Sequence, residues 1–474
     1  MRSAKIGAWF GVWFGVWGGL LGATSGCSLV TSFEECASAA DCARAYGAGT
    51  QCVEGICAPL AEASRLSEAC AVGLGAATDG GALVFGAMAP EAGVSSGDQV
   101  TSASALWDGV RLAVEEINAA GGVNGRQVAV IGCQGDDPTA AVAHLRGLGV
   151  SGQITLHRGE ALTTSLGGDA LTLVASPADS AEEASDRVWY TAPTPELSMR
   201  ALGQLIDDVV ASELGGREGV ALMLVTAPGF EAQAARLKEA ITAKPTITEV
   251  ALSDAAAVAA QIKADAPELV VLLGDGGAWA VIGADDDLSA SSGPRYLLGP
   301  GAFDASAAKQ ALTGVAGDAG INARVLGVRP QWAVAGYLPY VTFTTRYRTR
   351  YTRSAEGAPG LASAYDAVYA LALGAARQEV SGGTLASAMP LLSAPGGAAS
   401  SPGVEEVRAA LQTITSKQAV NFDGAGSALE FDARGHLKAA AVALWCRDSA
   451  GGLVEVRQPL VSVSGAFTSR RCGG

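Results

Sequence analysis

Few residues in this 474-residue chain have the type and spacing that enzyme chemistry requires. Gly93-Val94-Ser95-Ser96-Gly97 matches the GxSxG pattern of a nucleophile elbow. An elbow lies directly between a strand and a helix, whereas this motif follows the preceding apolar run only after several residues, so we interpret it as a turn or a ligand-side loop. The histidines His144, His157 and His436 are not spaced for a shared metal site, and HExxH, GxxxxGK[ST] and kinase patterns are absent. We therefore expect no enzyme, no cofactor and no metal.

Two charged stretches also have simple interpretations. Asp285-Asp286-Asp287 lacks the spaced oxygen ligands and the final Glu of a calcium loop, so we expect a solvated acidic loop. One basic stretch predicts a solvated helix face, with docking to an acidic partner as the alternative; it contains Arg346, Tyr347, Arg348, Arg350, Tyr351 and Arg353. The whole chain has 32 Lys+Arg against 47 Asp+Glu, a formal charge of −15. This acidic balance disfavours a nucleic-acid partner, since phosphates must be neutralised by basic groups.

The first 26 residues are typical of an export signal. Arg2 and Lys5 form a basic head, residues 6–23 are apolar, and small residues lead to Cys27. This arrangement resembles a bacterial lipoprotein signal, which implies cleavage before Cys27 and lipid attachment to that cysteine. Simple secretion and an uncleaved anchor are the alternatives, because 18 apolar residues are just long enough to span a membrane. We expect an exported protein with a lipid anchor in the cell envelope, either facing the periplasm or on the outer membrane. Ser28, directly after the cysteine, favours the outer membrane.

The remaining eight cysteines are an even number, as expected for disulfides in an oxidising compartment. Residues 27–72 are predicted to be a small lipid-anchored segment whose cysteines bond among themselves, in one of three pairings: Cys36, Cys42, Cys52 and Cys57. Their spacing lacks the CxxC pairs of a zinc site. Cys70 and Cys133 are expected to bridge neighbouring parallel strands. Cys446 and Cys472 are expected to tie the C-terminal tail to the body.

From residue 82 the chain alternates short apolar runs with amphipathic helical patterns. Strands are predicted at residues 82–88, 127–131, 154–156 and 171–175, and helices at 106–117 and 138–148. The alternation restarts at Val188, with strands at 220–225, 248–252, 269–273 and 296–298 and helices at 197–214, 230–243 and 255–264. Continuous apolar strands joined by helices are typical of parallel sheets covered on both faces. We predict an α/β fold with two doubly wound lobes and a cleft between them.

The chain is expected to pass between these lobes more than once. Lobe 1 is predicted to comprise residues 80–190 and about 326–385, and lobe 2 residues 191–325 and about 404–474. Residues 380–403 are rich in Gly, Ser, Ala and Pro and are predicted to be a flexible, low-complexity insertion.

Several motifs resemble one family. LAVEEINAAGGVNGRQVAV (residues 112–130), ASPADS (175–180), SAYDAVYALALGAA (363–376) and ALEFDARGHL (428–437) occur in the expected order. They resemble the type I periplasmic binding proteins, specifically the branched-chain amino-acid receptors of the leucine-binding protein family. The resemblance implies two lobes that close on a small ligand and deliver it to an ABC-type transporter.

The resemblance also implies which residues bind the ligand, and these follow predicted strands, where doubly wound sheets place their ligands. They are Gly159, Glu160, Ala178, Asp179, Ser180, Phe230, Gly301 and Asp304. Glu160 stands where the family has paired serines, and Gly301 where it has the acidic partner of the ligand ammonium. Since Glu160, Asp179 and Asp304 are all acidic, we expect a cationic or neutral polar ligand; Arg158 would offset one charge.

The expected function is therefore that of an extracytoplasmic solute-binding lipoprotein. It would capture a small polar ligand, such as an amino acid or an amide, for an ABC-type transporter permease or a sensor. The alternative is a ligand-free regulatory lipoprotein that uses the same fold to contact an envelope protein. A ligand that raises the melting temperature would distinguish the two.

Overall fold

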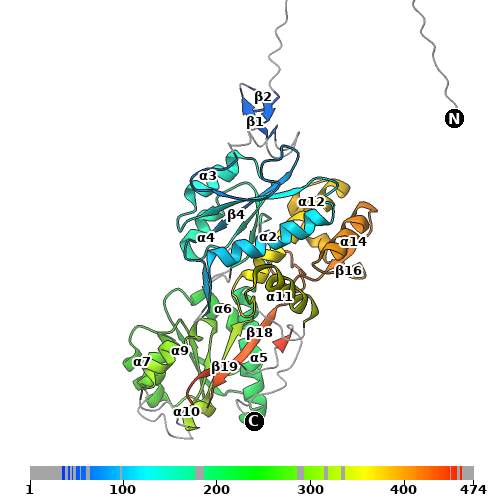
Figure 1. Ribbon diagram of the computed structural model, residues 1–474. Helices are drawn as coiled ribbons and strands as arrows, with labels where there is room; N and C mark the ends of the chain where they lie inside the picture. Colours follow the sequence, from blue (N-terminus) through cyan, green and yellow to red (C-terminus); the bar gives the residue numbers. More distant parts are fainter. Residues whose placement is uncertain are drawn as a thin grey trace, which may run out of the picture.

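The structure is a computed structural model with two α/β lobes stacked end to end (Figure 1). It describes residues 35–37, 41–42, 45, 50–53, 55–59, 65–96, 99–176, 186–284, 293–313, 319–331, 337–448, 450–455 and 460–461. The predicted signal, Cys27, Asp285-Asp286-Asp287 and Cys472 lie outside these residues. No helix in this described part of the chain combines the length and hydropathy needed to cross a membrane.

Lobe 1 is built on a six-stranded sheet with the order β10-β9-β8-β4-β7-β3. Its strands are β3 (Val72–Gly75), β4 (Leu83–Ala89), β7 (Val128–Gln134), β8 (Gly152–Thr155), β9 (Leu171–Val174) and β10 (Val188–Tyr190). All neighbours are parallel except β3, which runs antiparallel to β7. The sheet is thus the predicted parallel one with an additional antiparallel edge strand.

Helices cover both faces of this sheet because its central strands are buried on both sides. In β4, Phe85 and Ala87 belong to one core cluster, whereas Val84 and Met88 face a second cluster that contains Leu145 of α3. The helices of lobe 1 are α2 (Ala103–Ala119), α3 (Thr139–Gly147), α4 (Gly159–Ser165), α11 (Leu338–Tyr351), α12 (Leu361–Ser381), α13 (Leu385–Ala388), η3 (Met389–Leu392) and α14 (Val404–Thr415). Smaller strands complete the lobe: β5 (Val94–Ser96) with β6 (Gln99–Thr101), and β16 (Ala398–Ser400) with β17 (Val420–Phe422).

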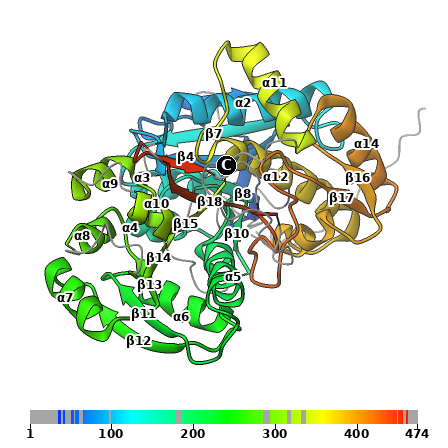
Figure 2. The same cartoon turned by 90° about the horizontal axis from the view of Figure 1, so that it is seen from below.

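Lobe 2 has a second sheet with the order β12-β11-β13-β14-β15-β18-β19, with β20 also paired to β18. Its strands are β11 (Ala221–Thr226), β12 (Thr246–Ala251), β13 (Leu269–Leu273), β14 (Arg295–Leu298), β15 (Val325–Pro330), β18 (Ala441–Arg447), β19 (Leu453–Glu455) and β20 (Leu460–Val461). The first five are parallel, and β18 joins β15 antiparallel. Its helices are α5 (Pro195–Glu213), α6 (Glu231–Ala240), α7 (Ala255–Asp265), α8 (Ala278–Gly283), η2 (Pro300–Ala302), α9 (Ala305–Ala311) and α10 (Ala319–Arg324), seen from below in Figure 2.

The cysteine-rich segment contains a small antiparallel hairpin of β1 (Thr50–Val53) and β2 (Ile56–Pro59), beyond the far end of lobe 1 in Figure 1. Its disulfides are Cys36–Cys52 and Cys42–Cys57, one of the three pairings left open by the sequence. Cys36, Cys42 and Cys57 are also the one group of potential metal ligands in the described part of the chain. Their sulfurs are bonded to sulfur, so this segment is ordered by disulfides rather than by a metal.

Cys70 and Cys133 form a disulfide, which is the pairing that the sequence predicts. The geometry differs from the prediction, because Cys70 precedes the antiparallel strand β3 instead of connecting two parallel strands. Cys446 is also disulfide-bonded. Its predicted partner Cys472 lies outside the described residues, so that pairing stays a prediction.

The division of the chain between the lobes differs from the prediction in two places. Strand β15 belongs to the lobe 2 sheet, whereas the sequence predicts residues from about 326 onward in lobe 1. Residues 404–440 belong to lobe 1, because the apolar face of α14 packs in the same core as α2 and α12, through Val407, Leu411 and Ile414. The chain therefore crosses between lobes before α5, after β15 and before β18.

Residues 380–403 are not a plain surface insertion as predicted. Leu385, Met389 and Leu392 are buried in the lobe 1 core, and α13 begins with a capping box at Thr384 and Ser387. Glycine, serine and alanine dominate the segment, but these few larger apolar side chains are enough to fix it against α12.

The basic stretch predicted as a solvated helix face lies on α11 and, at Arg353, just after it, and it pairs with acids of α2 in the same chain. Arg350 binds Glu115 with both N–O distances at 3.1 Å, and Arg353 pairs with Asp108. The acidic partner of these arginines is thus α2.

Candidate functional site

The loops that follow the lobe 1 strands meet at the carboxyl edge of the sheet. Arg158, after β8, donates a hydrogen bond of 2.7 Å to the carbonyl oxygen of Ser95, which lies in the hairpin after β4. Gly360 has a φ of +74° and lies against three strand ends: a Cβ there would be 3.3 Å from the oxygen of Ala175, 3.5 Å from Leu156 and 3.7 Å from Val94. Four segments far apart in sequence therefore converge here.

Ser95 is the serine of the GxSxG motif, and its position in the structure is not that of a nucleophile elbow. It lies in the short hairpin strand β5 instead of on a strand-to-helix turn. The loop interpretation is the one that the structure supports, and this loop is adjacent to the predicted ligand residues through Arg158.

Gly159 and Glu160 begin α4 at this same edge. Gly159 has a φ of +56°, a backbone conformation that glycine adopts without steric cost, and the Glu160 side chain is exposed. A carboxylate in the first turn of a helix is favoured by the helix dipole. Glu160 is therefore accessible to a ligand, and its charge also suits its place in the helix.

His157 lies beside these residues but is turned into the protein. Its side chain is 2% exposed, and the Ser176 hydroxyl donates a 2.7 Å hydrogen bond to its carbonyl oxygen. Burial lowers the pKa of His157, and the nearby carboxylates of Asp136 and Asp137 oppose this effect. A buried neutral imidazole adds no positive charge to the edge of lobe 1.

The loops after β13 and β14 approach each other closely at the carboxyl edge of lobe 2. A Cβ at Gly301 would lie 2.6 Å from the oxygen of Gly274, and one at Gly276 would lie 2.9 Å from Oδ2 of Asp304. Side chains at these positions would clash, so glycine allows the two loops to pack. Asp304 is the N-cap of α9, where its Oδ1 accepts a 2.8 Å hydrogen bond from the Ala307 N–H.

Phe230 lies at the start of α6, after β11. Its backbone N–H donates to the oxygen of Ala227, whose own N–H donates to Leu273 at the end of β13. The ring is half-buried and packs partly on the lobe 2 core. Phe230 thus belongs to the same edge as Gly301 and Asp304, with part of its ring exposed.

The structure brings the predicted residues together in two groups, one in each lobe. Gly159 and Glu160 lie at the edge of lobe 1, and Phe230, Gly301 and Asp304 at that of lobe 2. Ala178, Asp179 and Ser180 lie outside the described residues. Among the described residues, no hydrogen bond or ion pair joins Glu160 to the lobe 2 group.

Two loops at these edges were missed as ligand-binding candidates by the sequence reasoning. One contains Ser95, and the other is Gly274-Asp275-Gly276-Gly277, where Asp275 accepts a 2.9 Å hydrogen bond from the Gly277 N–H. The second loop could have been predicted from its position, because this glycine-rich turn directly follows a buried strand and therefore lies at the carboxyl edge of the sheet.

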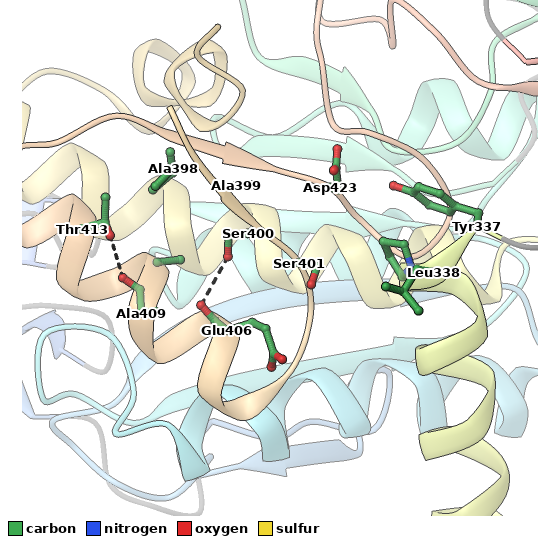
Figure 3. A pocket seen from close by; sticks show the side chains of 13 residues that line it. Tyr337, Leu338, Ala398, Ala399, Ser400, Ser401, Glu406, Ala409, Thr413 and Asp423 are labelled. Atoms are coloured by element: carbon green, nitrogen blue, oxygen red, sulfur yellow. Dashed lines mark hydrogen bonds between the residues drawn. The ribbon is translucent and has the colours of Figure 1, made fainter. Parts of the chain in front are cut away.

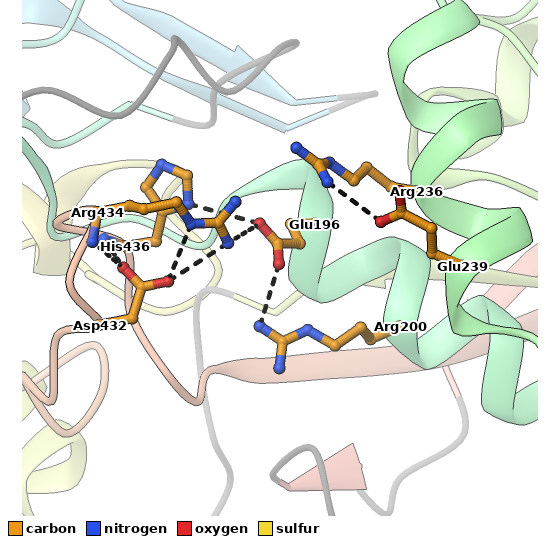
Figure 4. A network of polar contacts seen from close by, with 7 residues as sticks. All are labelled: Glu196, Arg200, Arg236, Glu239, Asp432, Arg434 and His436. Atoms are coloured by element: carbon orange, nitrogen blue, oxygen red, sulfur yellow. Dashed lines mark hydrogen bonds and ion pairs between the residues drawn. The ribbon is translucent and has the colours of Figure 1, made fainter.

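An ionic network connects the lobes near the third crossing, as Figure 4 shows. Arg434, in the turn before β18, lies 2.5 Å from Oε2 of Glu196, in the first turn of α5. Glu196 also pairs with Arg200 at 3.5 Å, and Arg434 with Asp432 at 3.4 Å. His436 lies 3.6 Å from the same Glu196 oxygen, and burial lowers the pKa of its imidazole. The network therefore fixes the lobe 1 turn to the first helix of lobe 2.

Comparison with known protein families identifies this architecture. The model of the family described as "Periplasmic binding protein" matches residues 85–444. The chain belongs to this family. Its resemblance to the branched-chain amino-acid receptors is therefore confirmed at the level of the family and fold.

Three solved structures are similar to this chain. A putative branched-chain amino acid ABC transporter protein from Rhodospirillum rubrum is 16% identical, covers 79% of this chain and 100% of its own, and has a TM-score of 0.52. The branched-chain amino acid transporter substrate binding protein LivJ from Streptococcus pneumoniae, in complex with isoleucine, is 17% identical, with coverage of 80% and 99% and a TM-score of 0.49. A solute binding protein from R. palustris, in complex with benzoate, is 17% identical, with coverage of 82% and 100% and a TM-score of 0.46. Comparison with curated protein sequences gave no match.

Proposed function

We propose that this protein is an extracytoplasmic, lipid-anchored solute-binding periplasmic binding protein that captures a small polar ligand between its two lobes. The observation that carries the proposal is the convergence of strand-end loops at the carboxyl edge of each sheet. Doubly wound sheets bind their ligands at this edge. Three chain crossings connect the lobes, which is the connectivity that lets two rigid lobes close on a ligand.

The charges at the two edges favour a cationic or neutral polar ligand. Glu160 is exposed on lobe 1. On lobe 2, Asp304 caps α9 through its Oδ1 atom, so its Oδ2 atom does not take part in the cap. Arg158 is the basic residue of this edge, and its guanidinium donates to the Ser95 carbonyl, which holds it against the hairpin. In the described part of this edge, a ligand carboxylate would therefore meet Glu160 without a matching cation that is directed at it.

Delivery of the ligand to an ABC-type transporter or a sensor is part of the proposal, because members of this family serve as the binding components of such systems. The second candidate is a ligand-free regulatory lipoprotein that contacts an envelope partner. One observation favours it: Gly301, which stands at the position of the family's acidic ligand partner, is required as glycine by its 2.6 Å approach to Gly274. That position can therefore not carry an acidic side chain in this chain.

Ligand screening by thermal unfolding separates the two candidates. Purified protein is heated with amino acids, amides, sugars, polyamines and short peptides, each at millimolar concentration. A ligand at about 100 times its Kd stabilises the folded state by about 2.7 kcal/mol, which is a clear shift in melting temperature. A flat response across the whole panel would favour the regulatory candidate.

The role of Glu160 is tested with the cationic ligand that gives the largest shift. Glu160→Gln should weaken its binding by roughly 1–3 kcal/mol, the typical loss of a hydrogen bond to a charged group. Asp169→Asn is the matched control, since this exposed acid precedes β9 and so lies at the opposite edge of the same sheet. Equal effects of both variants, or tighter binding of an anionic ligand to wild type than to Glu160→Gln, would contradict the proposed site.

A further inference from the structure

Lobe 1 contains a cavity that is separate from the strand-end loops. It has a volume of about 570 Å³ and lies between the start of α11, strand β16, helix α14 and the end of β17 (Figure 3). All of these elements belong to lobe 1, so the cavity does not depend on closure of the two lobes. Its volume is in the range of small-molecule binding sites.

Small and apolar side chains form most of its wall. Leu338, Pro339, Ala398, Ala399, Ala409 and Val420 line it. The alanines leave room where larger side chains would fill the space between β16 and α14. Leu338 is 72% exposed and adds apolar surface at the mouth of the cavity.

Two polar groups without partners meet in this apolar surrounding. Among the described residues, no donor contacts the carboxylate of Asp423, and the buried hydroxyl of Tyr337 has no hydrogen-bond partner. Tyr337 reaches from the start of α11 toward Asp423, as Figure 3 shows. The backbone places Asp423 firmly, since its N–H donates a 2.8 Å hydrogen bond to Ser400 in the neighbouring strand. An unpaired buried hydroxyl is costly, and the half-buried Asp423 carboxylate has no donor beside it in the described part of the chain, so the two groups together favour a partner from outside the chain.

The charge of the cavity selects the kind of partner. The described residues that line it include two carboxylates, Glu406 and Asp423, but no lysine, arginine or histidine. Arg346 of α11 donates to the Pro402 oxygen at 3.0 Å and lies 3.2 Å from a Glu116 carboxylate oxygen. Its guanidinium and the Glu406 carboxylate both lie beside Gly403, so among the described lining residues Asp423 is the carboxylate that has no nearby cation. Burial and Glu430 raise the pKa of Asp423, as expected for a carboxyl group without a cation.

We propose that this cavity is a second binding site for a small amphipathic primary amine, whose ammonium bonds to Asp423 and Tyr337 while its apolar body lies against Leu338 and the alanines. An ammonium group carries three donors and no acceptor, which matches a carboxylate and a hydroxyl oxygen. The proposal is independent of the ligand between the lobes.

The probe for this site is n-hexylamine, protonated at neutral pH, with 1-hexanol and hexanoate as neutral and anionic analogues of the same chain length. Each is titrated against the full protein by saturation-transfer NMR. We expect hexylammonium to bind at least tenfold more tightly than either analogue. Hexanol or hexanoate binding as tightly as hexylammonium would overturn the proposal.

Variants locate the binding. Asp423→Asn should weaken hexylammonium by roughly tenfold or more, and Ala409→Trp, at an exposed position of the wall, should abolish binding by filling the cavity. Glu405→Gln is the matched control, because Glu405 is the exposed neighbour of Glu406, pairs with Arg408 and does not line the cavity. Unchanged binding to Ala409→Trp would overturn the proposal even where Asp423→Asn fails to fold. Loss of binding in Glu160→Gln instead would assign the amine to the strand-end loops and would equally overturn it.

Discussion

We predict that the disulfide between Cys70 and Cys133 stabilises lobe 1 and has little effect on the stability of lobe 2. It fixes the segment before the edge strand β3 to the neighbouring strand β7, and both cysteines are buried, with exposures of 0% and 2%. The two cysteines are 63 residues apart. In the chain-entropy treatment, closing a loop of that length stabilises the folded state by about 4 kcal/mol. The double variant Cys70→Ala/Cys133→Ala removes this constraint.

Hydrogen exchange followed by mass spectrometry measures this effect separately in the two lobes. Peptides that cover β7 report on the lobe 1 sheet, and peptides that cover β13 report on lobe 2. A loss of about 4 kcal/mol corresponds to roughly a thousandfold lower protection of the β7 amides. Protection of β13 should stay unchanged, because its core is formed by other side chains.

The matched control is the variant Cys36→Ala/Cys52→Ala. That disulfide closes a loop with a separation of 16 residues in the N-terminal hairpin segment, so its removal should leave the protection of both sheets unchanged. The reasoning would be refuted if the Cys70/Cys133 variant lost less than about 1 kcal/mol in β7, since even short loops are expected to give more. Equal losses in β7 and β13 would refute the assignment of the effect to lobe 1.

Two further predictions concern the anchor and a buried carboxyl group. Cys27→Ser should release the protein from membranes into the soluble fraction, because the acyl chains are attached to that thiol; membrane fractionation that is the same for variant and wild type, with no lipid label on wild type, would contradict this. Burial raises the pKa of Asp366 to about 7, although the N–H groups of Ala425 and Gly426 donate to its carboxylate at 2.6 and 2.7 Å. Because the folded state binds this proton more tightly than the unfolded chain, the stabilisation from Asp366 should be complete below about pH 4 and should be lost as the pH rises to about 7, by an amount on the order of 4 kcal/mol. Urea unfolding from pH 4 to 8 should show this loss in wild type but not in Asp366→Asn, and identical pH profiles for the two proteins would rule it out.

Much of the candidate site could be placed from sequence because strand ends are predictable. The run at residues 269–273 is continuous and apolar, and β13 has the same bounds. The loops that follow such strands must lie at the carboxyl edge, which is where Glu160, Phe230 and Asp304 are found. The close approach of Gly301 to Gly274 could not be predicted, since it depends on the side-by-side order of β13 and β14.

The sequence by itself determined the alternation of buried strands and amphipathic helices, and therefore two doubly wound lobes. These follow from local hydrophobic periodicity, which depends on neighbouring residues alone. Tertiary structure decided which elements pack together. Helix α14 has an apolar face that would suit either sheet, and its contacts with α2 and α12 assign it to lobe 1. The cavity beside Asp423 exists because α14 packs on lobe 1. A pattern of buried positions predicts that a helix face is covered. It predicts neither which element covers that face nor the space left between the two elements.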